Sequence, residues 1–287
     1  MTKEVILHQQ NAALDNTQPE TDFTNMFTKD VFIKGVFMCA IECIFFINIV
    51  KTMPLANTLQ AINLKPFDLW RLLNSFIKFD PLMPRNLNNH FREIEVKIVT
   101  ETAWTPGSPV LDIVRELCRS HDSSSKLSQQ EMILQPYNLF FKRLLHLAAE
   151  RIKELGEKIG LDERLIEKIW EVTKMQLSTE PQLLINRCLD VLVMCAIYGV
   201  CKVQPGLGIQ FNTIITKYTE LFMNSKTVFH VYMQVSTLNG EKKDIIAFYN
   251  EVYIKEMKDY IISMKPEPEP VFERGAGSKT PLVHKPP

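Results

Sequence analysis

The stretch CLDVLVMCAIYGVCKV, residues 188–203, decides the fold class of this chain. Its apolar residues occupy nearly every side of a helix instead of forming a single stripe. A helix that is apolar nearly all round has to be buried on several sides. We therefore predict a central helix that is surrounded by neighbouring helices.

The remainder of the chain also has helical spacing. Apolar residues recur at intervals of three and four, and no strand-like alternation persists. Helix-end signals occur at Asp68, Pro84, Gly160, Asp162 and Ser178. We expect Ser178 to cap the long helix through residues 183–203, with Pro181 in its first turn. The prediction is an all-α protein in which a central helix is packed as in a five-helix cyclin-like lobe.

Changes in composition divide the chain. A polar run, RSHDSSSKLSQQ, follows Cys118 and is typical of a linker, and both ends are polar or rich in Pro and Gly. We predict a disordered segment 1–23, a first lobe 24–118, a linker 119–136, a second lobe 137–265 and a disordered tail 266–287.

Charge and cysteine content restrict the function classes. Lys+Arg and Asp+Glu both total 33, so no net charge favours direct binding to nucleic acid or to an anionic membrane. The six cysteines lie mostly in apolar runs, and no signal peptide opens the chain, which favours a reducing, intracellular compartment. The apolar stretch Val36–Val50 contains Glu42 and is too short to span a membrane, so we predict a buried core helix.

No motif predicts an enzyme. The chain lacks GxSxG, HExxH, CxxC and Walker-type sequences, and Gly206 and Gly208 lack a third glycine. Cys39 and Cys43 are spaced as two metal ligands can be, but core thiols fit their apolar surroundings better. His146 fits a surface or packing role better than that of a base. We expect no catalytic residue, no metal and no cofactor.

Polar residues on otherwise apolar helices of the second lobe suggest a binding groove. Tyr198 and Lys202 are neighbours across one helical turn, and four-residue spacing places a second set on one slanted stripe: Ile246, Asn250, Ile254, Lys258 and Ile262. An amide between apolar residues can pair with the backbone of an extended peptide, and lysines attract acidic side chains. An ordinary amphipathic face would show the same periodicity, so both interpretations stay open.

These same regions carry a resemblance to a known family. The second lobe resembles the B half of the retinoblastoma-family pocket in HLAAERI (146–152), CLDVLVMCAIYGVCKV (188–203), FNTIITKY (211–218) and DIIAFYNEVYI (244–254). The first lobe resembles successive segments of the A half in DVFIKGVFMCAIECI, AINLKPFDLWRLLNSFIK and ETAWTPGSPVLDIV. Order and spacing agree across both lobes. The opening helices of the A half have no counterpart in this resemblance, and the linker is short.

The resemblance implies two packed cyclin-like lobes and a nuclear transcriptional corepressor that restrains entry into the DNA-synthesis phase. It implies a cleft for LxCxE-bearing partners, which in the family include histone deacetylase and other chromatin complexes and viral proteins. The matching positions are Tyr198, Lys202, Phe211, Ile246, Tyr249, Asn250, Ile254, Lys258 and Ile262. Ile254 stands where the retinoblastoma protein has Met, which exchanges a flexible side chain for a stiff one of similar volume.

A second implied surface lies between the lobes, where family members hold the transactivation segment of DP-partnered cell-cycle transcription factors. Four positions fit: Arg71, Glu95, Leu139 and Lys142. Asn74 and Arg92 occupy positions where the retinoblastoma protein has acidic residues, which puts the salt-dependent part of this affinity in doubt.

Two other function classes share some of these features. A cyclin-like or general-transcription-factor-like adaptor would have paired helical lobes without an LxCxE cleft, and a helical enzyme would need a motif that the chain lacks. Thr280, followed by a proline in the tail, is a candidate phosphorylation site, although a Thr-Pro pair in such a tail can also be incidental.

Overall fold

The computed structural model describes residues 27–49, 53–79, 82–106, 108–111, 113, 128–222, 235–237 and 240–266. Several predicted features lie outside the described residues. They are the N-terminal segment 1–23, the tail except Pro266, the first part of the linker, Cys118 and Thr280. Helices dominate, which confirms the all-α class, and the described residues add one pair of two-residue strands to them.

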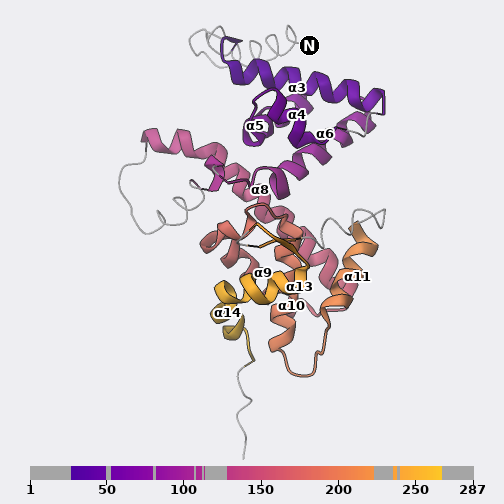
Figure 1. The fold of residues 1–287 in the computed structure, drawn as a ribbon, viewed down its shortest axis with the longest axis vertical. Helices are drawn as coiled ribbons and strands as arrows, with labels where there is room; N and C mark the ends of the chain where they lie inside the picture. The colour runs from indigo at the N-terminus through magenta and orange to yellow at the C-terminus, as the bar shows by residue number, and fades with distance from the viewer. Residues whose placement is uncertain are drawn as a thin grey trace, which may run out of the picture.

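The helices form two groups that lie one above the other along the long axis (Figure 1). The first group contains α3 (Asp30–Ile47), α4 (Leu55–Ala61), α5 (Pro66–Phe79), α6 (Arg85–Lys97) and the π-helix η1 (Ile98–Thr102). The second contains α9 (Glu163–Thr179), the 3-10 helix η2 (Pro181–Leu184), α10 (Leu189–Val203), α11 (Phe211–Phe222), α13 (Ile245–Phe248), the π-helix η3 (Tyr249–Tyr253) and α14 (Ile254–Ser263). Helix α8 (Ser128–Ile159) belongs to the second lobe and reaches up to the first.

The central helix of the second lobe is α10, as predicted. Every residue from Leu189 to Ile197 is buried, and so are Gly199, Val200 and Cys201. Helices α8, α9, α11 and α14 all contact it. Surrounding α10 in this way is the only means of removing its apolar surface on every side from water.

The predicted start of α10 was wrong. Ser178 lies in the last turn of α9, where its hydroxyl donates to the Lys174 carbonyl, 2.9 Å away. The chain then forms η2 and turns at Asn186, whose φ is 55°, before α10 begins at Leu189. A serine hydroxyl can bond to the carbonyl four residues back as well as cap the next helix, and the sequence did not separate these alternatives.

Three other helix ends agree with the sequence. Pro84 directly precedes α6, Gly160 ends α8 with a φ of 88°, and Asp162 caps α9 by accepting a hydrogen bond from the Leu165 backbone N–H at 2.8 Å. Asp68 is no cap, because α5 already begins at Pro66 and Asp68 lies in its first turn. Proline is favoured at that first position.

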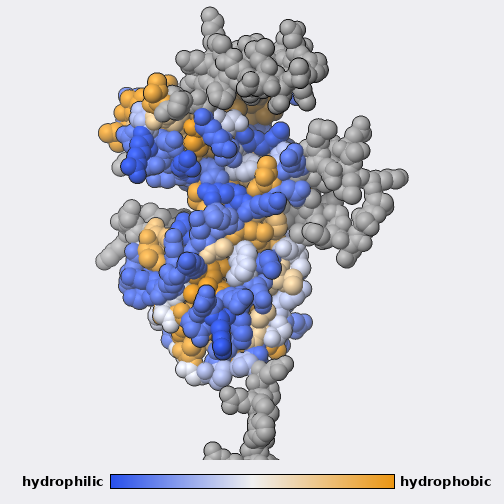
Figure 2. All heavy atoms as spheres, turned by 180° about the vertical axis from the view of Figure 1, so that it is seen from behind, coloured by the Kyte–Doolittle hydropathy of each residue, from blue (hydrophilic) through white to orange (hydrophobic). Residues whose placement is uncertain are grey.

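The prediction that α3 is a buried core helix was wrong. This helix buries only Gly35, Met38, Cys39 and Glu42, whereas Ile33, Phe37, Ile44 and Ile47 are all more than half exposed. Helix α3 runs across the outer side of the first lobe (Figure 1), and hydrophobic surface gathers there at one end of that lobe (Figure 2). An apolar composition shows that a helix favours burial, but it does not show on how many sides neighbours cover it.

Aromatic side chains join the two lobes. Phe140 of α8 is fully buried and lies edge-on to Trp70 of α5, with ring centroids 4.9 Å apart. Trp104, which is also fully buried, packs on Phe140 and accepts a backbone hydrogen bond from Asn186 of the second lobe at 2.8 Å. The first and second lobes therefore share one continuous core.

The two strands β1 (Val235–Ser236) and β2 (Lys242–Lys243) form a small antiparallel pair. Between them, Gly240 has a φ of 78° and its N–H donates to the Thr237 carbonyl at 3.1 Å. None of the described helices has both the length and the apolar character that crossing a bilayer requires.

Candidate peptide-binding groove

A groove lies between the C-terminal half of α10 and the helix α14. The two helices approach closely because residue 199 is glycine: a Cβ there would lie 2.7 Å from Cδ1 of Ile261 and 3.4 Å from the Tyr249 hydroxyl. Gly199 and Ile261 thus form part of the floor. The tight contact fixes the distance between the two walls.

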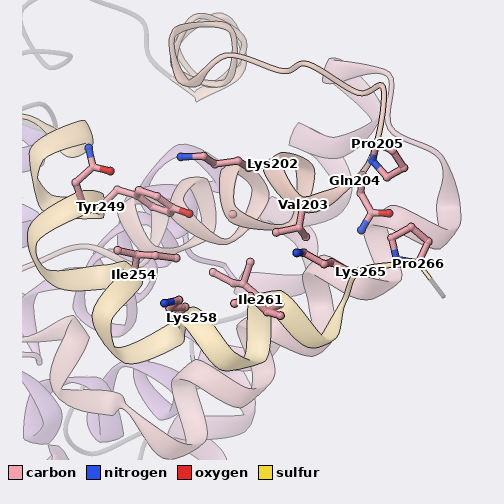
Figure 3. Close-up of a pocket in the computed structure, with 13 residues that line it drawn as sticks. Lys202, Val203, Gln204, Pro205, Tyr249, Ile254, Lys258, Ile261, Lys265 and Pro266 are labelled. Atoms are coloured by element: carbon pink, nitrogen blue, oxygen red, sulfur yellow. The ribbon is translucent and has the colours of Figure 1, made fainter. Parts of the chain in front are cut away.

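The groove has a volume of about 820 Å³. Figure 3 shows Lys202 and Val203 on one wall and Ile254, Lys258 and Ile261 on the other. Its lining is Gly199, Lys202, Val203, Gln204, Pro205, Tyr249, Asn250, Ile254, Lys258, Ile261, Ile262, Lys265 and Pro266. An open, mostly apolar channel with a few polar groups suits an extended peptide.

Three aromatic rings support one end of the groove. Tyr198 stands edge-on to Tyr249 at 4.9 Å and packs on Phe211 at 4.7 Å. Burial raises the pKa of the Tyr249 hydroxyl, which therefore stays protonated and can donate a hydrogen bond. This cluster provides a rigid apolar base with a polar tip at the groove.

Asn250 lies on the π-helical turn η3, between α13 and α14. Its side chain is exposed, whereas the neighbouring Tyr249 is only 2% exposed. A four-residue step advances by about 40° beyond a full turn in an α-helix, but a turn closed by i→i+5 bonds holds more residues. The π turn therefore counteracts the drift of the slanted stripe between Asn250 and Ile254, and both residues line the same groove.

The charge of the groove is positive. Lys202, Lys258 and Lys265 line it, and among the described residues no acidic side chain does. The Lys202 ammonium lies 5.3 Å from the Tyr198 ring centroid and 5.9 Å from that of Tyr249, so the rings hold it above the aromatic base. Within the described ranges these three lysines form no ion pair with a carboxylate. Acidic side chains of a ligand would find unpaired cations here.

The far end of the groove is closed by the chain after α14. The Gln204 side-chain amide and the Lys168 ammonium both donate to the Met264 carbonyl, at 2.9 and 3.0 Å. These two bonds hold the end of α14 against α10 and α9. Pro205 and Pro266 lie at this end (Figure 3).

The structure brings together most of the predicted site. Six of the nine residues line the groove: Lys202, Tyr249, Asn250, Ile254, Lys258 and Ile262. Tyr198 and Phe211 support Tyr249 from behind, and Ile246, at 38% exposure, lies outside the lining. Sequence reasoning missed Gly199, Val203, Gln204, Pro205, Ile261, Lys265 and Pro266. The glycine inside an apolar helix was the one local signal of a close helix contact that could have been used.

The second predicted surface is only partly accessible. Arg71 and Lys142 are exposed, and Leu139 is 55% exposed. Glu95 is buried: its carboxylate accepts two hydrogen bonds from Arg143 of α8, both at 3.0 Å, and a third from the Trp70 indole at 3.2 Å. This carboxylate joins the two lobes, and a ligand could use it only by breaking that ion pair. Asn74 and Arg92 are exposed, and Arg92 donates to Asn88.

No metal centre forms among the residues that the structure describes, where no three His, Cys, Asp or Glu side chains cluster as ligands would. Cys39 is fully buried and Cys43 partly so. His146 lies on the surface, 3.2 Å from Glu150.

The structure has two packed helical lobes and a basic, largely apolar groove. Comparison with known families identifies the kind of protein. Residues 4–114 match the retinoblastoma-associated protein A domain, residues 136–258 match its B domain, and together the two matches cover most of the chain. The chain belongs to the retinoblastoma pocket-protein family, which is non-enzymatic and regulates transcription and the cell cycle.

Individual relatives are distant. The chain is 22% identical to the retinoblastoma-related protein 3 of Zea mays and to the retinoblastoma-related protein of Cocos nucifera, over 85% of this chain and 34% of each relative. The similar protein of Pilosella officinarum is 20% identical over 92% of this chain and 36% of its own length. The chain thus spans about a third of the relatives that it matches.

The A-domain match begins at residue 4, inside the segment 1–23 that was predicted to be disordered. Helix α8 begins at Ser128, inside the predicted linker 119–136. The domain boundaries remain predictions.

Proposed function

We propose that this chain docks LxCxE-bearing proteins in the groove between α10 and α14, and that it acts in the nucleus as a corepressor of cell-cycle genes. The observation that carries the proposal is the position of Asn250. This residue is exposed beside the buried Tyr249, and it lines the groove together with Lys202 and Ile254. An amide can both donate to and accept from the backbone of a buried extended peptide.

The remaining groove chemistry supports the same class of ligand. Ile254, Ile261 and Val203 offer apolar contacts for side chains such as those of Leu and Cys, and three lysines offer partners for Glu. Chromatin-modifying complexes and viral proteins that carry such motifs are the partners proposed.

Binding of the transactivation segment of DP-partnered transcription factors is a second proposal. It rests on Arg71, Leu139 and Lys142, which are exposed where α5 meets α8. Glu95 is left out of this proposal because Arg143 and Trp70 already use its carboxylate.

The test is calorimetric titration with an LxCxE peptide beside one whose Leu, Cys and Glu are changed to Ala. The parent protein is expected to bind only the first. Asn250→Ala should cost roughly 1–3 kcal/mol, about ten- to a hundredfold in affinity, because peptide backbone groups would be left unpaired.

The control is Asn57→Ala, which truncates an exposed asparagine on α4 in the first lobe and should leave the affinity unchanged. Equal affinity for the two peptides would refute the proposal. So would an Asn250→Ala protein that is folded and binds as tightly as the parent.

A further inference from the structure

Arg187 is a buried arginine that the groove does not use directly. It is 7% exposed, and within the described residues no carboxylate lies in ion-pair range of it. Its Nε donates to the Ser236 carbonyl at 2.6 Å and its Nη1 to the Leu183 carbonyl at 3.0 Å. The guanidinium lies over the Phe248 ring, 4.6 Å from the centroid. One side chain therefore contacts the η2 segment, strand β1 and helix α13.

These contacts connect Arg187 to the residues that line the groove. Phe248 is fully buried and is the last residue of α13, directly before Tyr249 and Asn250 on the π turn. Strand β1 lies against α13 (Figure 1). On the other strand, the Lys243 ammonium pairs with Glu251 at 2.8 Å. This second contact is exposed, so it should contribute little by itself.

Only an arginine can make all three contacts. Its planar fork presents several N–H donors in fixed directions and stacks on a ring, which lysine and methionine cannot do together. Burying a guanidinium without a carboxylate is unfavourable unless its donors are satisfied. Burial lowers the pKa of Arg187 to about 10, so the side chain is still charged at neutral pH.

We propose that Arg187 is a positioning residue for the groove, which holds Phe248 and strand β1 so that the following π turn presents Tyr249 and Asn250 to the ligand. This inference rests on the proposed peptide function for its binding consequence. It goes beyond that function by assigning specificity for the peptide backbone to a residue that touches no ligand.

The test compares Arg187→Met with Arg151→Met. Arg151 is the matched control, because it also stacks on a ring, that of Phe222 at 4.1 Å, and lies 3.4 Å from Asp190, but it holds α8 against α10 and α11. Both substitutions should lower the denaturation midpoint. Only Arg187→Met should weaken LxCxE binding, by about tenfold, and Arg187→Lys should give an intermediate loss.

A second readout needs no peptide. In ¹⁵N-labelled protein, the side-chain amide signals of Asn250 should shift in Arg187→Met and stay in place in Arg151→Met. Unchanged Asn250 signals, or peptide affinity within about twofold of the parent, would overturn the inference. If the parent bound no LxCxE peptide, the proposed function would fail, and the Asn250 signals would still decide the role of Arg187. If Arg187→Met did not fold, Arg187→Lys would provide both readouts.

Discussion

Lys202, Lys258 and Lys265 surround the groove in different settings. Both Lys202 and Lys258 are exposed, but only Lys202 lies above two aromatic rings among the described residues. A cation held over aromatic rings is fixed in position, whereas a cation without such a contact acts mainly through screened attraction. The three lysines should therefore contribute to peptide binding in different ways.

Lys258→Ala should reduce affinity less than Asn250→Ala and mainly flatten the dependence of affinity on salt. A rim cation acts through screened attraction, which weakens as ionic strength rises. Titrations at low and high salt measure this effect. A variant with the same salt dependence as the parent would show that Lys258 does not interact with the acidic part of the peptide.

Asp190 contributes a pH dependence to stability. It is buried at the start of α10, accepts a hydrogen bond from the Tyr218 hydroxyl at 2.6 Å, and lies near Arg151. Burial raises the pKa of Asp190 from its ordinary value of 3.8, and Arg151 and Tyr218 offset this only in part. The folded state therefore holds the proton more tightly than the unfolded state does.

This difference in proton binding sets the direction in which stability changes with pH. The contribution of Asp190 to stability is fully present below the unfolded pKa and is lost as the pH rises through the raised folded pKa. Asp190→Asn should remove this decline, so the stability of the parent relative to the variant should fall as the pH rises above about 4. Urea midpoints from pH 4 to 7 provide the test. Parallel profiles would contradict the assignment.

Among the elements that line the groove, the π turn η3 is the one that periodicity could not predict. Four-residue spacing correctly placed Asn250, Ile254, Lys258 and Ile262 on one face, but the sequence shows no feature that marks a single i→i+5 turn. Such turns are held by the packing around them, here by the buried Tyr249 and Tyr253. The capping role of Asp162 was predictable because a helix cap is a local interaction. The exposure of α3 was not predictable, because it depends on neighbours that are distant in the sequence.

The contact between α10 and α14 can be tested with Gly199 and Ile261. Gly199→Ala gains about 1 kcal/mol in helix propensity but forces its Cβ onto Cδ1 of Ile261, which is overpacking that costs about 1–3 kcal/mol. In an Ile261→Val background, which lacks Cδ1, the same substitution should be more favourable by about 1 kcal/mol. A double-mutant cycle of unfolding free energies measures this coupling. Additive values would show that a Cβ at residue 199 does not clash with Cδ1 of Ile261.

At the scale of the whole molecule, α8 makes the two lobes interdependent. Its early part places Tyr137 and Phe140 against Phe67 and Trp70 of α5, and its later part packs on α9, α10 and α11. The linker composition correctly suggested two units, but it could not show that one helix contributes to both cores. The resemblance gave the order of the segments, whereas the ion pair of Glu95 across the lobes could be found only from side-chain positions.

The last prediction is that residues 24–118 do not form a stable domain alone. A fragment that ends at residue 118 lacks Phe140, which packs on Trp70 and Trp104. It also lacks Arg143, the ion-pair partner of the Glu95 carboxylate. Removing one partner of a buried ion pair is strongly destabilising, and the exposed rings would add to the apolar face that α3 already presents. The second lobe covers the rings of α5 and leaves α3 exposed. Residues 24–118 should therefore be insoluble or melt without cooperativity in calorimetry, whereas residues 24–265 should melt in one transition. A soluble first lobe with a cooperative transition of its own would show that the lobes fold independently and that α8 only bridges them.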